Sequence, residues 1–295
     1  MSALAKGAIG SWLNMVKFSH SIFALPFALS SAWLASGGLP EPRVLVLIVL
    51  CTVAARTAAM AFNRLVDRRI DGLNPRTQNR ELVSGEVSTS KATLGVLISS
   101  AIFIAGAFAL NPLSGWLSIP VLIVLLGYSF TKRVTWLAHL VLGLALGLAP
   151  LGAWLAVTGT LESDIASPLL LALAVMTWVA GFDLIYSCQD AEFDRKQSLH
   201  SIPARFGIAR ALRWSVWLHV VTAAALIVFG SVASLGGLYW GALVLVLALL
   251  IWQHKLVSAD DLSRVDMAFF TLNGWVGVLL FIGLAADLAF WNGVS

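Results

Sequence analysis

The stretch from 63 to 80, NRLVDRRIDGLNPRTQNR, carries oxygen-bearing side chains at a spacing that suits metal binding. Asn63, Asp67 and Asp71 follow one another at intervals of four residues. If the segment is helical, this interval places all three side chains along one face. Their oxygens are hard ligands, which suit Mg²⁺, and no Cys or His accompanies them. The stretch therefore predicts one half of a magnesium site.

A second stretch, DLIYSCQDAEFD from 183 to 194, has a similar pattern. Asp183, Asp190 and Asp194 are separated by seven and four residues, and Tyr186 precedes Asp190 by four. These intervals again share one helical face. Asp183 lies inside a long apolar run, where a carboxylate costs about 2.5–3.5 kcal/mol on membrane-insertion scales. A functional acidic site explains this residue better than a solvated helix end does.

Two groups of carboxylates that face each other repel unless a cation lies between them. Mg²⁺ usually takes few protein carboxylates and shares its coordination shell with phosphate oxygens. Nearby Arg and Lys side chains can bind the remaining phosphate charge. The two stretches together therefore predict a Mg²⁺–diphosphate site at the mouth of a helical bundle. An apolar cavity beside it would suit a lipid diphosphate.

The composition indicates an integral membrane protein of the all-α class. The chain has 295 residues, of which 59% are hydrophobic and 12% charged, and its mean hydropathy is +0.88. A soluble domain carries roughly 25% charged residues. A helical span needs about 20 apolar residues. We expect nine spans, at 21–38, 43–62, 92–110, 113–130, 137–157, 168–187, 212–231, 234–252 and 267–289.

The basic residues predict how these spans are oriented. When loops are assigned alternately to the two sides, all but two of the 19 Lys and Arg residues fall on one side. The exceptions are Arg43, on the other side, and Arg56, within a span. The positive-inside rule therefore places the N-terminus and both acidic stretches at the cytoplasmic face of a bacterial-type inner membrane. No basic surface with interleaved aromatic residues lies outside these loops, so we expect no nucleic-acid partner.

The spacing of the acidic stretches also indicates a weak internal repeat. Asp67 and Asp190 are each followed by a basic loop, and these loops end at Gly85 and Gly207 at nearly equal distances. We expect a single membrane domain over 1–295. It would contain two helical repeats, about 20–130 and 137–252, and a last span at 267–289.

Three blocks of the sequence resemble the UbiA superfamily of intramembrane prenyltransferases. Residues 55–88 resemble its N-x-x-x-D-x-x-x-D motif with the basic loop that follows, and residues 183–207 resemble its D-x-x-Y-x-x-x-D-x-x-x-D motif. Between them, YSFTKRVTWLAHLVLGLALGLAP at 128–150 resembles the family's Y-x-x-x-K-R segment. The resemblance implies nine transmembrane helices around a central cavity. It also implies transfer of a prenyl group from an allylic polyprenyl diphosphate to an acceptor, usually an aromatic ring.

The resemblance further implies roles for individual residues. Asn63, Asp67 and Asp71 would bind one Mg²⁺, and Asp190 and Asp194 a second. Diphosphate would be bound by basic and hydroxyl side chains, namely Lys132, Arg133, Tyr128, Arg68 and Arg80. The acceptor would contact Arg56, Asp183 and Tyr186. The expected catalytic carboxylates are Asp67, Asp190 and Asp183.

Two of these residues keep alternative roles. Asp183 would either orient the acceptor or take a proton from it, and Arg56 would either bind an acceptor carboxylate or pair with an acid such as Asp183. The resemblance of the second motif favours an aromatic acid of the 4-hydroxybenzoate type as acceptor, as in the prenyltransferases of ubiquinone synthesis. The segment KFSHSIFALPFA at 17–28 also resembles enzymes that prenylate 1,4-dihydroxy-6-naphthoate in the futalosine route to menaquinone. There, His20 is more typical of an interfacial side chain than of a site residue.

The competing functional class is a secondary transporter, which also combines internal repeats with intramembrane acids. The acids of this chain gather at the cytoplasmic ends of the predicted spans and not at the bilayer midplane. No pair of spans broken by Gly or Pro is evident either. The sequence therefore favours the enzyme over the transporter.

Overall fold

A computed structural model describes residues 7–17, 23–162 and 164–292, and every regular element in these ranges is helical. The first half of the chain forms α1 (Ala8–Met15), α2 (Leu25–Ser36), α3 (Pro42–Leu73), α4 (Thr89–Leu110), α5 (Pro112–Gly127), η2 (Tyr128–Phe130) and α6 (Thr131–Val134). The second half forms α7 (Ala138–Thr158), α8 (Ala166–Ser187), η3 (Cys188–Asp190), α9 (Ala191–Lys196), α10 (Ile202–Phe206), α11 (Ile208–Val232), α12 (Gly237–Leu256), η4 (Met267–Leu272) and α13 (Asn273–Asn292).

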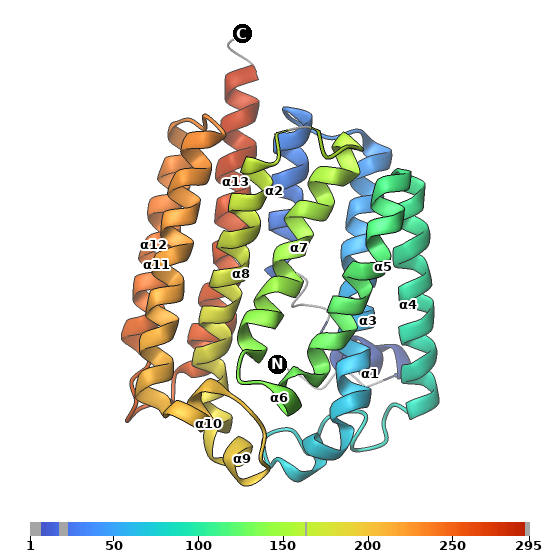
Figure 1. Ribbon diagram of the computed structural model, residues 1–295, viewed down its shortest axis with the longest axis vertical. Coiled ribbons are helices and arrows are strands. Elements are labelled where there is room, and N and C mark those ends of the chain that lie inside the picture. The colour runs from blue at the N-terminus through green and yellow to red at the C-terminus, as the bar shows by residue number, and fades with distance from the viewer. Residues whose placement is uncertain (1–6, 18–22, 163, 293–295) are drawn as a thin grey trace.

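The long helices run side by side as a bundle, with the acidic stretches at one end. In Figure 1 the short helices α6, α9 and α10 and the loop after α3 gather at the lower end, while α13 ends at the upper one. Large apolar side chains cover the outside, for example Trp217, which is 68% exposed, and Val244, which is 65% exposed. An apolar outer surface on a helical bundle is the arrangement that a bilayer requires. The protein is an integral membrane protein.

The described ranges contain eight helical segments that are long and apolar enough to cross a membrane, one fewer than the nine predicted spans. Each of the last eight predicted spans coincides with one of these segments. The first, 21–38, corresponds to α2, an apolar helix of only 12 residues. The start of that span, like His20, lies outside the described residues.

Helix α3 continues well past the predicted end of its span and carries the first acidic motif. It runs without a break for 32 residues, so Asn63, Asp67 and Asp71 lie on one face as predicted. The helix ends before Pro75, because a residue that precedes proline is disfavoured in the α conformation. Asn74 is accordingly extended, with φ −92° and ψ 119°. The chain turns there into the loop that follows.

The second acidic motif lies on a helix that changes geometry before it ends. Helix α8 stops at Ser187, a 3₁₀ turn covers Cys188–Asp190, and α9 then carries Asp194. The backbone N–H of His200, beyond α9, donates to the carbonyl of Lys132 at 2.7 Å. This bond ties the second motif to α6, and so to the basic segment at 132–133.

Two glycines let α7 pack directly on α8. A Cβ atom on Gly143 would lie 2.2 Å from the carbonyl oxygen of Met176, and one on Gly147 would lie 2.8 Å from that of Ala172. Neither approach leaves room for a side chain. The two helices are antiparallel neighbours in close contact, and this contact fixes their register.

Candidate active site

Side chains from both acidic motifs line one cavity of about 670 Å³ at the motif end of the bundle. Asn63, Asp67 and Asp71 reach it from α3, as do Asp190 and Asp194 from the segment after α8. The predicted basic and acceptor-side residues on its wall are Arg56, Arg80, Tyr128, Lys132, Arg133, Asp183 and Tyr186. The structure therefore brings together all but one of the predicted site residues.

The exception is Arg68, which is exposed to solvent and does not line the cavity. It follows Asp67 by one residue, so it projects about 100° around the helix from the acidic face. Arg64, three residues before Asp67, does line the cavity and is only 5% exposed. The prediction that Arg68 contributes to the site is not supported by its position.

The carboxylates of the first motif are paired with arginines. The Nη2 atom of Arg133 donates to Oδ1 of Asp67 at 2.8 Å, and the amide of Asn63 donates to the other oxygen at 2.9 Å. The Nη1 atom of Arg80 donates to Oδ1 of Asp71 at 2.6 Å. These contacts hold the carboxylates in place and neutralise part of their charge.

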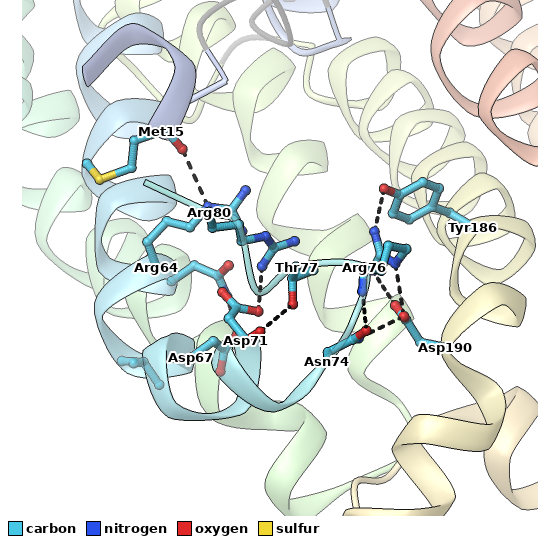
Figure 2. A network of polar contacts seen from close by, with 12 residues as sticks. Met15, Arg64, Asp67, Asp71, Asn74, Arg76, Thr77, Arg80, Tyr186 and Asp190 are labelled. Carbon is cyan, nitrogen blue, oxygen red and sulfur yellow. Dashed lines mark hydrogen bonds and ion pairs between the residues drawn. The ribbon is translucent and has the colours of Figure 1, made fainter. Parts of the chain in front are cut away.

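The carboxylate of Asp190 is paired with Arg76, a residue that the sequence did not single out (Figure 2). Arg76 donates to both carboxylate oxygens, through Nε at 2.9 Å and through Nη2, and Asn74 adds a third bond at 3.0 Å. Arg76 also donates to the hydroxyl of Tyr186 at 2.7 Å and lies over its ring. Burial alone would lower the pKa of Arg76, but the hydrogen bond to Asp190 and the charges of the acidic groups around it together outweigh burial and raise the pKa.

Asp194 differs from the other motif acids. It is 2% exposed, and its Oδ2 atom has no hydrogen-bond partner. A buried carboxylate oxygen without a partner is costly, and a bound cation would satisfy it. Among the described residues, however, no three Asp, Glu, His or Cys side chains already converge as a metal site. The oxygen donors fit Mg²⁺ in type, while arginines occupy the carboxylates of Asp67, Asp71 and Asp190.

Arg56 and Asp183 lie deeper in the same cavity. The Nε atom of Arg56 is buried without a hydrogen-bond partner, and Arg56 also borders a second, largely apolar cavity of about 180 Å³ between α3, α4, α5 and α7. Asp183 is not paired with Arg56. Its Oδ2 lies 2.7 Å from Nδ1 of His139 on α7. Of the two roles predicted for Arg56, the pairing with Asp183 is therefore not what the structure contains.

Three side chains that bond to carboxylates of the second motif were missed in the sequence: Asn74, Arg76 and His139. Asn74 and Arg76 flank Pro75 in the quoted stretch NRLVDRRIDGLNPRTQNR, so their polar character was visible. His139 stands in the otherwise apolar segment LAHLVLG, which was a signal of the same kind as Asp183. What could not be read was which carboxylate each of them contacts.

A helical membrane bundle in which two acidic motifs and a set of basic side chains meet over one cavity has the architecture of an intramembrane prenyltransferase. The sequence profile of the UbiA prenyltransferase family matches residues 24–277. The chain belongs to this family and is an enzyme, an aromatic prenyltransferase.

Individual relatives agree with this assignment. The 4-hydroxybenzoate octaprenyltransferase of Nitrosomonas europaea is 33% identical over 88% of this chain and 87% of the relative. That of Shewanella piezotolerans is 31% identical over 88% of each chain. An apo structure of a UbiA homologue from Aeropyrum pernix is 36% identical and has a TM-score of 0.84, covering 92% of this chain and 98% of that one.

A more distant solved structure shares the fold. The UbiA homologue of Archaeoglobus fulgidus bound to DMAPP and Mg²⁺ is 21% identical, with a TM-score of 0.71 over 95% of this chain and 99% of that one.

Proposed function

We propose that this enzyme transfers a polyprenyl group from an allylic polyprenyl diphosphate to the ring of 4-hydroxybenzoate, in a Mg²⁺-dependent reaction of quinone biosynthesis. The observation that carries the proposal is the contact between the two motifs. Asn74 and Asp190 are 116 residues apart in sequence and share a hydrogen bond at the cavity. The names of the relatives at 31–33% identity support the choice of acceptor.

The acidic residues would hold two Mg²⁺ ions. Asn63, Asp67 and Asp71 would bind one, and Asp190 and Asp194 the other, for which the unpartnered oxygen of Asp194 is available. The solved relative bound to DMAPP and Mg²⁺ supports a divalent metal at such a site. The bound metal supplies Lewis-acid stabilisation of the leaving diphosphate.

The basic residues of the cavity would bind the diphosphate. Arg76, Arg80 and Arg133 are each paired with a motif carboxylate, and Lys132 lies on the same wall. With Mg²⁺ held by the carboxylates, these arginines would be free to donate to phosphate oxygens. Guanidinium–phosphate pairs are charge-assisted and often bidentate, so the exchange replaces one strong contact with another. Tyr128, on the cavity wall, can add a hydroxyl donor.

Arg56 and Asp183 would bind the acceptor from opposite ends of its ring. The buried Nε of Arg56 lacks a partner, and a carboxylate of the acceptor would supply one. Asp183 lies on the same cavity wall and can accept a hydrogen bond from the acceptor hydroxyl. The hydroxyl of Tyr186 is already bonded to Arg76, so Tyr186 contributes to the acceptor site through its ring.

The reaction can then be written from these positions. The bond between the allylic carbon and the diphosphate oxygen breaks with its electron pair on the diphosphate. A ring carbon of the acceptor attacks the allylic cation, and a proton leaves the acceptor for the carboxylate of Asp183. The cavity wall near Asp183 is apolar and aromatic, with Phe23, Phe182 and Phe269, which keeps water away from the cation.

The proposed membrane orientation follows from the basic loops. The motif end of the bundle carries the arginines of both loops, and the positive-inside rule assigns such an end to the cytoplasm. The polyprenyl chain would then lie among apolar residues deeper in the bundle.

The test is an acceptor panel with the purified enzyme. Radiolabelled polyprenyl diphosphate and Mg²⁺ are supplied with 4-hydroxybenzoate, 1,4-dihydroxy-6-naphthoate or a glyceryl phosphate, and both the prenylated product and diphosphate are measured. We expect product with 4-hydroxybenzoate and its loss when EDTA removes Mg²⁺. If only the naphthoate gave product, the proposed acceptor would be wrong and the naphthoate would take its place. If neither aromatic acid led to release of diphosphate, the proposed function would be refuted.

A further inference from the structure

We propose that His139 is a positioning residue that holds the carboxylate of Asp183 for proton transfer from the acceptor. The inference rests on the proposed function, because it deepens the part that Asp183 plays in that reaction. It concerns a histidine that neither acidic motif includes. His139 lies on α7, whereas Asp183 lies on α8.

The contact between the two side chains is short, and only Asp183 faces the cavity. The Nδ1 atom of His139 lies 2.7 Å from Oδ2 of Asp183. His139 is 0% exposed and does not line the cavity, whereas the Asp183 side chain is 19% exposed and does. The histidine therefore lies behind the carboxylate, on the side away from the substrates. It contacts the catalytic group without contacting a reactant.

The register of α7 on α8 creates this contact. Gly147 lies against Ala172, and Gly143, four residues earlier on α7, lies against Met176, four residues later on α8. The two helices are therefore antiparallel, and facing positions recur at every turn. One further step brings position 139 beside position 180, one turn before Asp183. The two glycines that allow close approach thus place the imidazole within hydrogen-bond distance of the carboxylate.

The two ring nitrogens of His139 have different surroundings. Nε2 is buried without a hydrogen-bond partner. Nδ1 lies against the carboxylate of Asp183, and a carboxylate oxygen accepts hydrogen bonds, so Nδ1 is the donor of this bond. The imidazole therefore acts on Asp183 as a hydrogen-bond donor through one nitrogen only.

This bond gives the two carboxylate oxygens of Asp183 different roles. Oδ2 is held by His139, and Oδ1 has no hydrogen-bond partner within the described parts of the chain. With one oxygen fixed, the carboxylate cannot rotate freely, and the other oxygen stays available to the acceptor. When the ring carbon bonds to the allylic carbon, the proton that the acceptor loses moves to Asp183, and His139 keeps its own proton. Pre-orientation of this kind lowers the barrier without an added chemical step.

Three substitutions at position 139 test the inference. His139→Leu removes the donor and keeps the residue apolar, so kcat with 4-hydroxybenzoate should fall by roughly 10- to 100-fold, a part of what a positioned base contributes. The KM for the polyprenyl diphosphate should stay within about twofold, because His139 does not line the diphosphate site. His139→Asn places an amide donor close to the position of Nδ1 and should recover most of kcat. His139→Gln carries its donor one methylene further out and should not.

A structural role for His139 would give a different pattern. Thermal unfolding of each detergent-solubilised variant separates loss of fold from loss of rate, and if the Leu variant fails to insert, the Asn and Gln variants alone decide. Equal kcat for Asn and Gln, or wild-type kcat for Leu, would overturn the inference. In an Asp183→Asn background, His139→Leu should cost less than twofold, because the group it positions has gone. A loss there as large as in the wild type would also overturn it.

The outcomes distinguish this inference from the function on which it rests. If the wild type prenylates 4-hydroxybenzoate and Asp183→Asn is impaired while His139→Leu is not, the inference fails and the proposed function stands. If the wild type releases no diphosphate with any aromatic acid, both fail.

Discussion

The first acidic motif lies on one unbroken helix, whereas the second extends over the end of α8, a 3₁₀ turn and α9. Burial does not separate the two motifs, since the side chains of Asp71 and Asp190 are each 9% exposed. The difference lies in the backbone and in the partners. In the first motif, Asp71 is paired with Arg80 from the loop directly after its own helix, α3. In the second motif, Asp190 is paired with Arg76, which comes from that same loop after α3.

The loop after α3 therefore holds both motifs. Its Arg80 and Thr77 donate to the side chain and the carbonyl of Asp71, and its Asn74 and Arg76 donate to Asp190 (Figure 2). Among the described residues, no side chain of the second motif or of the loop after it forms a hydrogen bond with an acidic residue of the first motif. The two halves of the site are therefore unequal. One supplies its own supporting loop, and the other depends on that loop for its charge balance.

The largest effects should come from removing one carboxylate from each half. On the proposed function, Asp67→Ala and Asp190→Ala should each lower turnover by on the order of 1000-fold or more, because each removes charge that stabilises a leaving diphosphate through bound Mg²⁺. Both variants should still insert as folded protein. Product formation from radiolabelled polyprenyl diphosphate measures the loss.

Glu192→Ala is the matched control, since Glu192 lies between the two acids of the second motif but its side chain is 78% exposed. It should turn over at the wild-type rate. Near-normal activity in either Asp variant would refute a site shared between the two halves.

Much of this arrangement was predictable from the sequence, and the reasons are physical. In a chain with so little charge, apolar runs of about 20 residues indicate membrane spans. Eight of the nine predicted spans coincide with helical segments long and apolar enough to cross a membrane. A period of four residues fixes a helical face, so the acidic residues were found too. The one predicted span without such a match is the first, at 21–38, where the structure has α2, a helix of 12 residues.

The contacts that depend on tertiary structure were not predictable. Arg68 and Arg76 look alike in the sequence, but only the turn at Pro75 decides that Arg76 reaches Asp190. The His139–Asp183 contact needs the register of α7 on α8, which two glycines set through approaches that no local pattern shows. The proposed division of the chain into two helical repeats remains a prediction.

The shared loop can be tested by comparing Arg76 with Arg68. Arg76→Ala should lower kcat/KM for the polyprenyl diphosphate by roughly 10- to 100-fold, because it removes a guanidinium that is bonded to Asp190 and available to the diphosphate. Arg68→Ala should stay within about twofold, because Arg68 is exposed and lies off the cavity. Steady-state kinetics at saturating acceptor measures both.

Arg76→Lys adds a second comparison. It keeps the charge but loses the fork that spans both oxygens of Asp190, so it should recover only part of the rate. Equal losses in the Arg76→Ala and Arg68→Ala variants would show that net positive charge, and not the loop contact, supports the second half of the site.

The smallest effect should fall on one substrate only. Arg56 belongs to α3 like the first motif, but it lies seven residues before Asn63 and so about two helical turns deeper. Its buried Nε lacks a partner, and the proposed partner is the carboxylate of the acceptor. Arg56→Ala should therefore raise the KM for 4-hydroxybenzoate by about tenfold, which corresponds to about 1.4 kcal/mol, close to the lower end of what a hydrogen bond to a charged group contributes. The KM for the polyprenyl diphosphate should change by less than twofold.

Arg43→Ala serves as the control, because Arg43 is exposed and its Nη2 donates to the carbonyl of Ala109 on α4, far along α3 from the acidic face. Replacing 4-hydroxybenzoate with 4-hydroxybenzamide gives a second check, since it removes the carboxylate from the acceptor instead of the arginine from the protein. The wild type should bind the amide about as weakly as the Arg56→Ala variant binds the acid, and the variant should discriminate little between them. If the Arg56→Ala variant raised the KM values of both substrates equally, Arg56 would also support the diphosphate part of the cavity. The proposal that α3 binds metal at its end and the acceptor about two turns deeper would then be wrong.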